Sequence, residues 1–280
     1  MSDADREKGV RRILVAIDAS PPSLSALEVA AELAATLDAE LLGLYVEDIN
    51  LLRLAELPLA GEVTIYTSTP RRFSRPEIEH ELRTQARMAR RALAHVAELS
   101  QLRWSFHVEQ GVIEARLLSA AQQSDIILLG KGGWTKRRRL GTTARIVVER
   151  APRPIMVVQE GSRIGQPVGL IYDGSQAAQR ALWAAADLLR KRGDFLTVVI
   201  VAANSEQARD LQSDVSGWVR ERNIHVHFRW LTRANVNGLL HIAHGERCGT
   251  WVVPAGGEAF DRGQLIEFLN RMECPVLLVR

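Results

Sequence analysis

The feature that most constrains this sequence is a pattern of apolar runs and turn residues that occurs twice. Residues 13–17 are apolar and lead into Asp18-Ala19-Ser20, and residues 168–172 are apolar and lead into Asp173-Gly174-Ser175. A helix-forming segment follows each copy, and strand and helix patterns alternate behind it. Self-similarity of this kind marks a duplicated unit. The sequence therefore predicts two copies of one α/β domain.

The apolar runs have the length and character of parallel strands. Residues 13–17 show no polar alternation, as expected for a central strand covered on both faces. A helix between two such strands implies a right-handed crossover and a parallel sheet. A chain of 280 residues has room for two domains of about 140 residues each. We place them at residues 1–162 and 163–280, with the boundary inside a polar hinge at 160–167.

Each domain is expected to contribute five strands. In the first domain we expect strands at 13–17, 41–46, 104–108, 126–129 and 155–158, and helices at 23–37, 76–100, 113–121 and 144–150. In the second we expect strands at 168–172, 195–201, 226–231, 251–253 and 274–279, and helices at 177–189, 206–220 and 236–243.

A long insertion at residues 47–75 interrupts the first domain. It contains several leucines, a possible strand at 63–66 and a basic cluster at 71–75. A loop this long in a compact domain is usually a functional or interaction element. Two interpretations stay open: a lid or partner-binding surface, or an excursion whose leucines cover an edge of the sheet.

The segment after the fourth strand has the composition of a phosphate-binding loop. The expected strand at 126–129 is followed by Gly130 and Gly133, and the next helix opens with Gly141-Thr142-Thr143. Glycines let the backbone approach an anion, and the hydroxyl and amide donors at a helix N-terminus favour negative charge. Cations between the two ends would neutralise phosphate; the candidates are Lys136, Arg137 and Arg138. An ordinary connection with a solvated basic loop is the alternative.

The order of these features resembles the universal stress protein family. The closing signature consists of a strand, Gly130-x-x-Gly133, a spacer, Gly141-Thr142, a helix and Ala151-Pro152-Arg153-Pro154 before the last strand. The first strand and Asp18 match the opening of that family. The resemblance covers residues 11–159 apart from one insertion, and it returns in weaker form from 168 to the C-terminus. It implies a doubly wound, Rossmann-like parallel sheet with strand order 3-2-1-4-5 in each domain.

The resemblance also implies a ligand, ATP or another adenine nucleotide, with Mg²⁺ as an optional companion. Asp18 would lie beside the nucleoside, and the backbone near Val46 would meet the adenine. Ribose and phosphates would be wrapped by five residues: Gly130, Gly133, Gly141, Thr142 and Thr143. The spacer at 134–140 is two residues shorter than in the family's ATP-binding motif; two readings stay open, one in which Gly141-Thr142 is pulled away from the outer phosphates and one in which the lost length falls in the exposed part of the loop.

The second domain is expected to have lost this ligand. Pro254 stands where the first glycine would be and removes an amide donor, while Glu258 and Asp261 would repel phosphate. Its predicted role is structural. The two domains would pack like the subunits of a family dimer, either as an intramolecular pseudo-dimer or as part of a homodimer.

Composition argues against several other classes of protein. The net charge is only +3 and the basic clusters sit in loops, so nucleic acid is not an expected partner. No apolar run approaches the roughly 20 residues that span a membrane. With two cysteines and a charged segment at residues 1–9, the expected compartment is the cytoplasm.

No catalytic residues are predicted. His241, His244 and Cys248 have helical spacing but no evident fourth ligand, so no metal site is expected. Three hypotheses remain. The first is a stress-response module that binds an adenine nucleotide. The second is a nucleotide-free scaffold that binds a protein partner through residues 47–75, and the third is a slow ATPase with Asp18 as its one candidate carboxylate.

Overall fold

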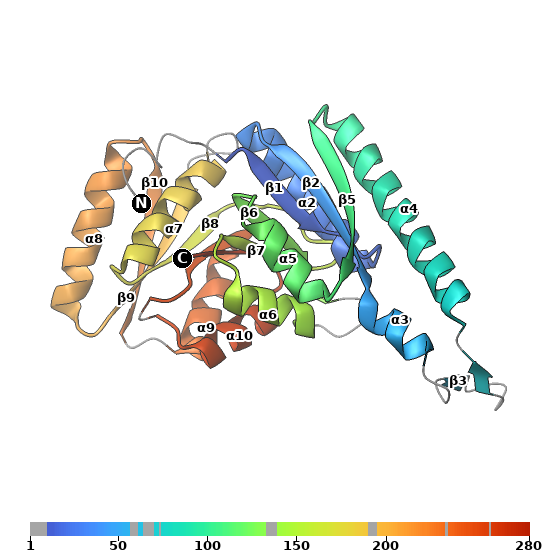
Figure 1. The fold of residues 1–280 in the computed structure, drawn as a ribbon. Helices are drawn as coiled ribbons and strands as arrows, with labels where there is room; N and C mark the ends of the chain where they lie inside the picture. The colour runs from blue at the N-terminus through green and yellow to red at the C-terminus, as the bar shows by residue number, and fades with distance from the viewer. Residues whose placement is uncertain are drawn as a thin grey trace.

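The structure is a computed structural model that describes residues 10–56, 61–63, 70–72, 74–132, 139–189, 195–232, 235–257 and 259–280. A single ten-stranded sheet runs through the molecule in the order β10-β9-β8-β11-β12-β7-β6-β1-β2-β5 (Figure 1). We refer to residues 10–159 as the first half and residues 164–280 as the second half.

The first half has the predicted strand order, 3-2-1-4-5. Its elements are β1 (Arg12–Ala16), α2 (Pro21–Leu37), β2 (Glu40–Asp48), α3 (Ile49–Ala55), β3 (Gly61–Val63), β4 (Pro70–Arg72), α4 (Arg75–Leu99), β5 (Trp104–Gly111), α5 (Ile113–Ala121), β6 (Ile126–Gly130), α6 (Thr142–Arg150) and β7 (Ile155–Val158). The strands β5, β2, β1, β6 and β7 are parallel neighbours in that order. The predicted doubly wound fold is therefore confirmed.

The second half repeats this plan. Its elements are β8 (Val168–Tyr172), α7 (Gln176–Leu189), β9 (Phe195–Ala202), α8 (Ser205–Arg220), β10 (His225–Thr232), α9 (Val236–Glu246), β11 (Thr250–Pro254), α10 (Arg262–Arg271) and β12 (Val276–Val279). The strands β10, β9, β8, β11 and β12 are again parallel neighbours in the same relative order. The helix α10 is not among the expected elements.

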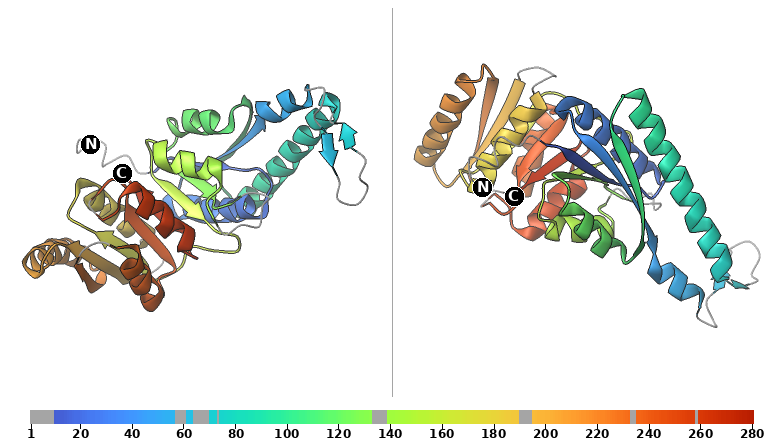
Figure 2. Two further views of the ribbon diagram at one scale, coloured as in Figure 1. Left: turned by 90° about the horizontal axis from the view of Figure 1, so that it is seen from below. Right: turned by 45° about the horizontal axis from the view of Figure 1, so that its top comes forward.

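Buried side chains on both faces of the sheet explain the continuous apolar strands. One core cluster combines the sheet with α2, α4, α7 and α8, and the other combines it with α5, α6, α9 and α10. Helices thus cover both faces, as the views in Figure 2 show. Local signals position the helices: α2 begins at the N-cap Ser20 with two prolines in its first turn, and it ends at Asp38 in the left-handed region.

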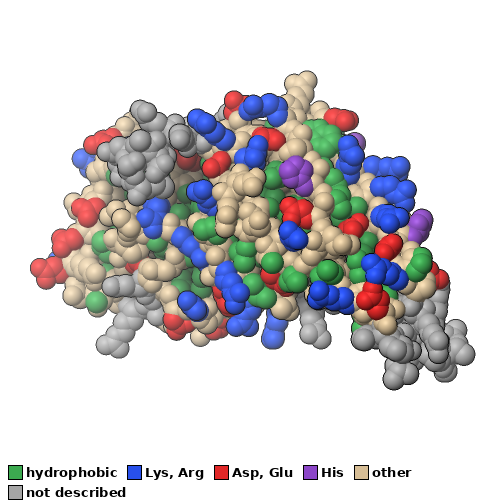
Figure 3. Space-filling view, viewed as in Figure 1, with side chains coloured by type: hydrophobic (Ala, Val, Ile, Leu, Met, Phe, Trp, Pro, Cys, Tyr) green, Lys and Arg blue, Asp and Glu red, His purple; other side chains and the backbone are tan. Residues whose placement is uncertain are grey.

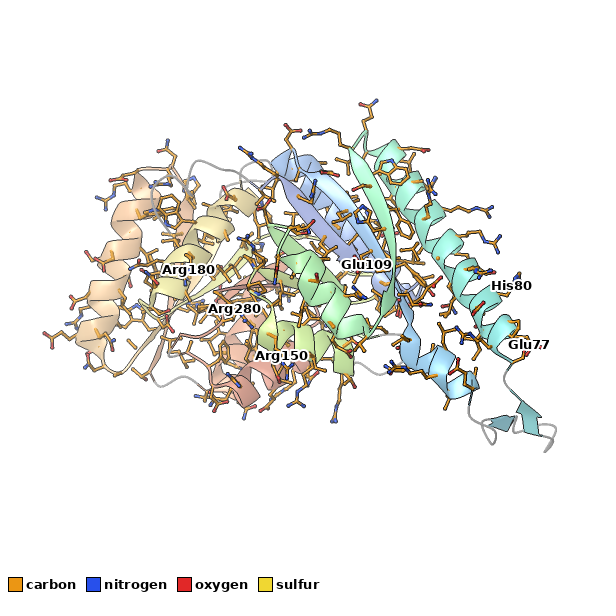
Figure 4. The ribbon with its side chains drawn as sticks, viewed as in Figure 1. Glu77, His80, Glu109, Arg150, Arg180 and Arg280 are labelled. Carbon is orange, nitrogen blue, oxygen red and sulfur yellow. The ribbon has the colours of Figure 1, made fainter. Side chains whose placement is uncertain are left out.

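An antiparallel pair, β7 with β12, joins the two halves. Met156 lies opposite Leu277, and both strands are buried along their whole length. Each strand would otherwise be an exposed sheet edge, so the pairing removes two edges at once. Arg150, Arg180 and Arg280 lie near this junction (Figure 4). The Arg280 guanidinium donates to the carbonyl of Val148 in α6.

The insertion projects from the end of the sheet (Figures 1 and 2). It contains α3 and a small antiparallel pair, β3 with β4, before α4 begins. On α3, Leu52 is buried, whereas Leu51 and Leu54 are 44% and 41% exposed. Of the expected strand at 63–66, only Val63, the last residue of β3, lies among the described residues. Leucines 57 and 59 also lie outside them.

Within the described residues, the structure contains no helix that combines the length and the apolar character needed to span a membrane. Figure 3 shows one face of the molecule, on which Lys and Arg side chains are interspersed with Asp and Glu.

Candidate functional site

An open cleft lies at the carboxyl ends of β1, β2 and β6. Its lining combines apolar residues of the strands and α5 with polar residues of the turns; the lining residues are Ala16, Ile17, Asp18, Ser23, Leu44, Tyr45, Val46, Ile113, Leu117, Leu129, Gly130, Gly132, Gly141, Thr142, Thr143 and Ala144. In an open α/β sheet, ligands bind at this position, where the connections reverse direction.

The cleft brings together six of the predicted ligand-binding residues. They are Asp18, Val46, Gly130, Gly141, Thr142 and Thr143. The seventh, Gly133, lies outside the described residues, as do the three predicted phosphate-neutralising residues Lys136, Arg137 and Arg138. Residues 18 and 141–143 are far apart in sequence, and the order of the strands brings them to one cleft.

A tight turn positions Asp18 at the end of β1. Its Oδ1 accepts hydrogen bonds from the amide of Ser20, at 2.9 Å, and from the Ser20 hydroxyl. Between them, Ala19 has a φ of 59°, in the left-handed region that normally favours glycine. Ser20 also caps α2, so the turn and the helix start share one residue. The Asp18 side chain is therefore held at the mouth of the cleft and stays exposed.

Gly130 is required by close packing between β6 and α2. A Cβ at this position would lie 2.7 Å from the carbonyl carbon of Pro22 and 2.9 Å from the amide nitrogen of Ser23. These atoms belong to the backbone and cannot move aside cheaply. The sequence suggested that Gly130 lets a ligand approach; the structure shows that it lets the first turn of α2 approach.

The start of α6 faces the cleft without a side-chain cap. Its N-cap is Gly141, with φ −64° and ψ 160°, and among the described residues the first turn has no side-chain capping hydrogen bond. The first amides of a helix lack intrahelical partners and carry partial positive charge. The amides that follow Gly141 are thus suited to an anion. Because its φ and ψ are ordinary and no atom lies within 4 Å of a Cβ built there, Gly141 could carry a side chain.

The two threonines of α6 differ in their partners. The Thr143 hydroxyl donates to Glu114 Oε1 at 3.1 Å, so its proton is already committed to α5. Thr142 is exposed at the cleft. Sequence reasoning missed Glu114, because nothing in a single sequence indicates that the first turn of α5 contacts the first turn of α6.

The inner wall of the cleft is apolar. Beyond Ala16 the register of β1 with β2 ends, and β2 continues through Tyr45 and Val46 along the cleft. The Tyr45 hydroxyl donates to Gln85 Oε1 at 3.0 Å. Burial raises the pKa of Tyr45, and the nearby carboxylates of Glu47, Asp18 and Glu81 raise it further. The phenol therefore stays neutral, and this wall suits a flat, weakly polar group.

At the equivalent place in the second half, carboxylates of the chain occupy the amide donors. Asp173 is buried; its Oδ1 accepts from the Ser175 amide at 3.0 Å, and its Oδ2 accepts from the Ala259 amide at 2.9 Å. Asp261 caps α10 in a capping box with Gln264. The predicted repulsion from Glu258 falls outside the described residues.

His244, Cys248 and Cys274 line a second recess, in the second half. Burial raises the pKa of Cys248 to about 11 and that of Cys274 to about 12, so both thiols are protonated at neutral pH. His244 Nδ1 lies 2.6 Å from the carbonyl oxygen of Leu240. Across the residues that the structure describes, no group of three or more His, Cys, Asp or Glu side chains could hold a metal ion.

The chain is an α/β protein with a doubly wound parallel sheet, and it has a carboxylate and an uncapped helix start at the switch point, the position at which such sheets bind small ligands. Residues 9–159 match the universal stress protein family. The match covers more than half of the chain, and the protein therefore belongs to that family.

Solved structures show the same fold over the whole chain. A universal stress protein from Archaeoglobus fulgidus DSM 4304 is 18% identical, with a TM-score of 0.75, and the match covers 95% of this chain and 97% of that one. A functionally unknown protein from Pseudomonas aeruginosa PAO1 is 13% identical, with a TM-score of 0.56, and the match covers 99% of this chain and 94% of that one. These identities establish the fold alone. No curated protein matches the sequence.

Proposed function

We propose that this chain is a universal stress protein of two domains, residues 1–162 and 163–280, whose first domain binds an adenine nucleotide as a regulatory ligand. ATP or a close relative is the proposed ligand. The observation that carries the proposal is the contrast between two helix starts. The first turn of α6 opens uncapped into a cleft beside Asp18, whereas the first turn of α10 is closed by Asp261.

The lining of the cleft offers a chemically suitable group for each part of such a ligand. The apolar wall formed by Leu44, Tyr45 and Val46 suits a base. Asp18, which is exposed at the mouth of the cleft, would accept hydrogen bonds from ribose hydroxyls. Phosphates would accept hydrogen bonds from the amides that follow Gly141. Mg²⁺, if it accompanies the nucleotide, would neutralise phosphate charge.

The second domain is proposed to be structural. Asp173 and Asp261 use the amides that would otherwise face an anion. The domain completes a pseudo-dimer through the pairing of β12 with β7. A cytoplasmic location stays a prediction.

The N-cap position of α6 allows a direct test of nucleotide binding. Gly141→Asp and Gly141→Asn both fit the space that the described residues leave and both provide a cap, so both should raise the free energy of unfolding by a few tenths of a kcal/mol. Only aspartate adds a negative charge at the proposed phosphate position. We expect ATP to bind Gly141→Asp at least about tenfold more weakly than Gly141→Asn, as measured by titration with labelled ATP.

Adenosine serves as the control ligand, because it lacks phosphates. Its affinity should differ little between the two variants. Equal ATP affinities for the two variants, or no saturable binding by the wild-type protein, would contradict the proposed function.

Two alternatives keep specific support. An interaction scaffold is favoured by the projecting insertion, where Leu51 and Leu54 are exposed. It would be preferred if the wild-type protein binds no nucleotide. A slow ATPase is the weaker alternative. Asp18 is the one carboxylate in the described lining of the cleft, whereas fast phosphoryl transfer needs a base and a metal ligand. Phosphate release that Asp18→Ala abolishes would support it.

A further inference from the structure

The residue after Gly130 reaches across the junction into the second half. Lys131 is only 4% exposed, and its Nζ donates hydrogen bonds to the carbonyl oxygens of Asn270 and Met272, both at 2.8 Å. These carbonyls are at the C-terminal end of α10. The last carbonyls of a helix lack intrahelical partners and carry partial negative charge, so an ammonium group is well placed there.

The other end of the same loop is bound to the same helix end. The amide of Leu140, the residue before the N-cap of α6, donates to Asn270 Oδ1 at 2.8 Å. The Gly141 amide donates to the Lys131 carbonyl at 3.0 Å, which ties the two loop ends together. A third contact runs from Gln159 Nε2 to the Met272 carbonyl. Asn270 therefore holds both ends of the loop that connects β6 to α6.

The arrangement is one-sided. In the first half, the Lys131 amide donates to the Val158 carbonyl at 2.7 Å, and in the second half the Ala255 amide donates to the Val279 carbonyl at 2.7 Å. Ala255 is thus the structural equivalent of Lys131, and its methyl group can donate no hydrogen bond. The turn of the second half is held instead by its own Asp173 and Asp261. Among the described residues of the two loops, those beside the open cleft are the ones that hydrogen-bond to the opposite half.

We propose that the C-terminal end of α10 supports the nucleotide site of the first half from outside the cleft, and that Asn270 is the positioning residue. Asn270 touches no ligand; it fixes Leu140 and thereby the start of α6, where the phosphates would bind. The second half then sets the affinity of a cleft to which it contributes no lining residue. This inference rests on the proposed function.

The linkage works in both directions. If the fastened loop binds nucleotide more tightly, bound nucleotide must strengthen the contact between the loop and α10 by the same factor. Nucleotide should therefore slow hydrogen exchange at the C-terminal end of α10.

The test uses the full chain and one substitution on α10. Asn270→Ala removes the acceptor of the Leu140 amide but keeps the main-chain carbonyl that Lys131 uses. Without nucleotide, exchange of the Leu140 amide should speed up by about fivefold or more, and Asn270→Asp, which keeps an acceptor, should restore it. In a titration with ATP, Asn270→Ala should bind about five- to tenfold more weakly than the wild type.

Asn237 on α9 offers a matched control, because it binds Arg271, the residue that follows Asn270. Asn237 Oδ1 accepts from Arg271 at 2.6 Å, so Asn237→Ala also removes a side-chain hydrogen bond at the end of α10, but none to the loop. It should change neither exchange at Leu140 nor ATP affinity. Unchanged Leu140 exchange in Asn270→Ala, or faster exchange with unchanged affinity, would overturn the proposal.

The exchange measurement separates this inference from the proposed function. If the wild-type protein binds no ATP, the proposed function fails and the role of Asn270 in affinity fails with it. Exchange at Leu140 in the ligand-free protein then still shows whether Asn270 holds the loop.

Discussion

At the residue scale, the two halves form the same turn with different residues. Ala19 and Gly174 follow the first strand of each half and both lie in the left-handed region, with φ of 59° and 78°. Alanine in this region is strained by contact of its Cβ with the backbone, whereas glycine is not. The turn is thus kept in both halves, at a cost in the half that has the open cleft.

Exchanging the two residues should move stability in opposite directions. Ala19→Gly should raise the free energy of unfolding by up to about 1 kcal/mol, because relief of the strain exceeds the added entropy of the unfolded chain. Gly174→Ala should lower it by about 1–2 kcal/mol, because its Cβ would also lie 2.6 Å from Leu211 Cδ2. Urea denaturation measures both; a loss of stability in Ala19→Gly would contradict the strain argument.

Single residues of the site were predictable where their chemistry is local. Glycine and threonine at a helix start, and an aspartate at a strand end, carry a signal within a few residues, which is why Asp18, Gly141 and Thr142 could be placed. Lys131 gave no such signal, because its partners are carbonyls about 140 positions away, as the sequence separations of its two bonds show. Gly130 was predicted to bind a ligand, and the structure shows a further demand for glycine there, its close contact with α2.

At the scale of elements, α10 shows how a short helix escapes detection. Its ten residues mix charged and apolar side chains and include Gly263 in the first turn, which weakens the periodic signal. The capping box of Asp261 and Gln264 was the available clue. Helices with longer apolar stripes, such as α2 and α4, were predicted to within about two residues of their bounds.

Glu246 at the end of α9 joins that helix to β10 by charged hydrogen bonds. Arg229 Nε donates to its Oε1 at 2.6 Å, and His227 Nδ1 lies 3.0 Å from its Oε2. Burial raises the pKa of Glu246, but the hydrogen bonds and charges of Arg229 and His227 outweigh burial and lower it overall. A carboxylate with a lowered pKa stabilises the folded state above its unfolded pKa, and this contribution is lost as pH falls through the folded value.

We therefore expect Glu246→Gln to lower the free energy of unfolding by about 1 kcal/mol at pH 7. This figure allows for solvent screening, because the side chains of Arg229 and His227 are half-exposed. The difference from the wild type should shrink as pH falls below about 4.5 and vanish once the native carboxyl is protonated. Denaturation at a series of pH values checks this. A difference that stays constant down to pH 3 would mean that the charge is not involved.

At the scale of the whole molecule, the sheet is continuous across the two halves. The duplication and the strand order of each half follow from sequence patterns, since each strand is recognised by its own composition. The antiparallel pairing of β7 with β12 does not, because it depends on which edges of two finished sheets meet. The same geometry leaves β5 and β10 at the two ends of the sheet.

Separating the halves should expose the β7 edge. A fragment of residues 1–162 keeps its five strands but loses β12, and an unpaired apolar edge favours pairing with another chain. We expect this fragment to form a dimer through two antiparallel copies of β7, as measured by light scattering after gel filtration. A fragment that stays monomeric at high concentration would show that β7 does not drive association.

The antiparallel pairing of β7 with β12 also makes the two rims of the sheet, each formed by one set of strand ends, different from one another. Because the strands of the two halves run in opposite directions, their carboxyl ends lie on opposite rims of the sheet. Helices in this fold run antiparallel to their strands. The C-terminal ends of the second half's helices therefore lie on the same rim as the carboxyl ends of the first half's strands. One rim thus combines the open cleft of the first half with the hydrogen bonds that the end of α10 makes to its loop. On the other rim, Asp173 and Asp261 accept hydrogen bonds from the corresponding amides of the second half, so the two rims present different hydrogen-bonding groups to solvent.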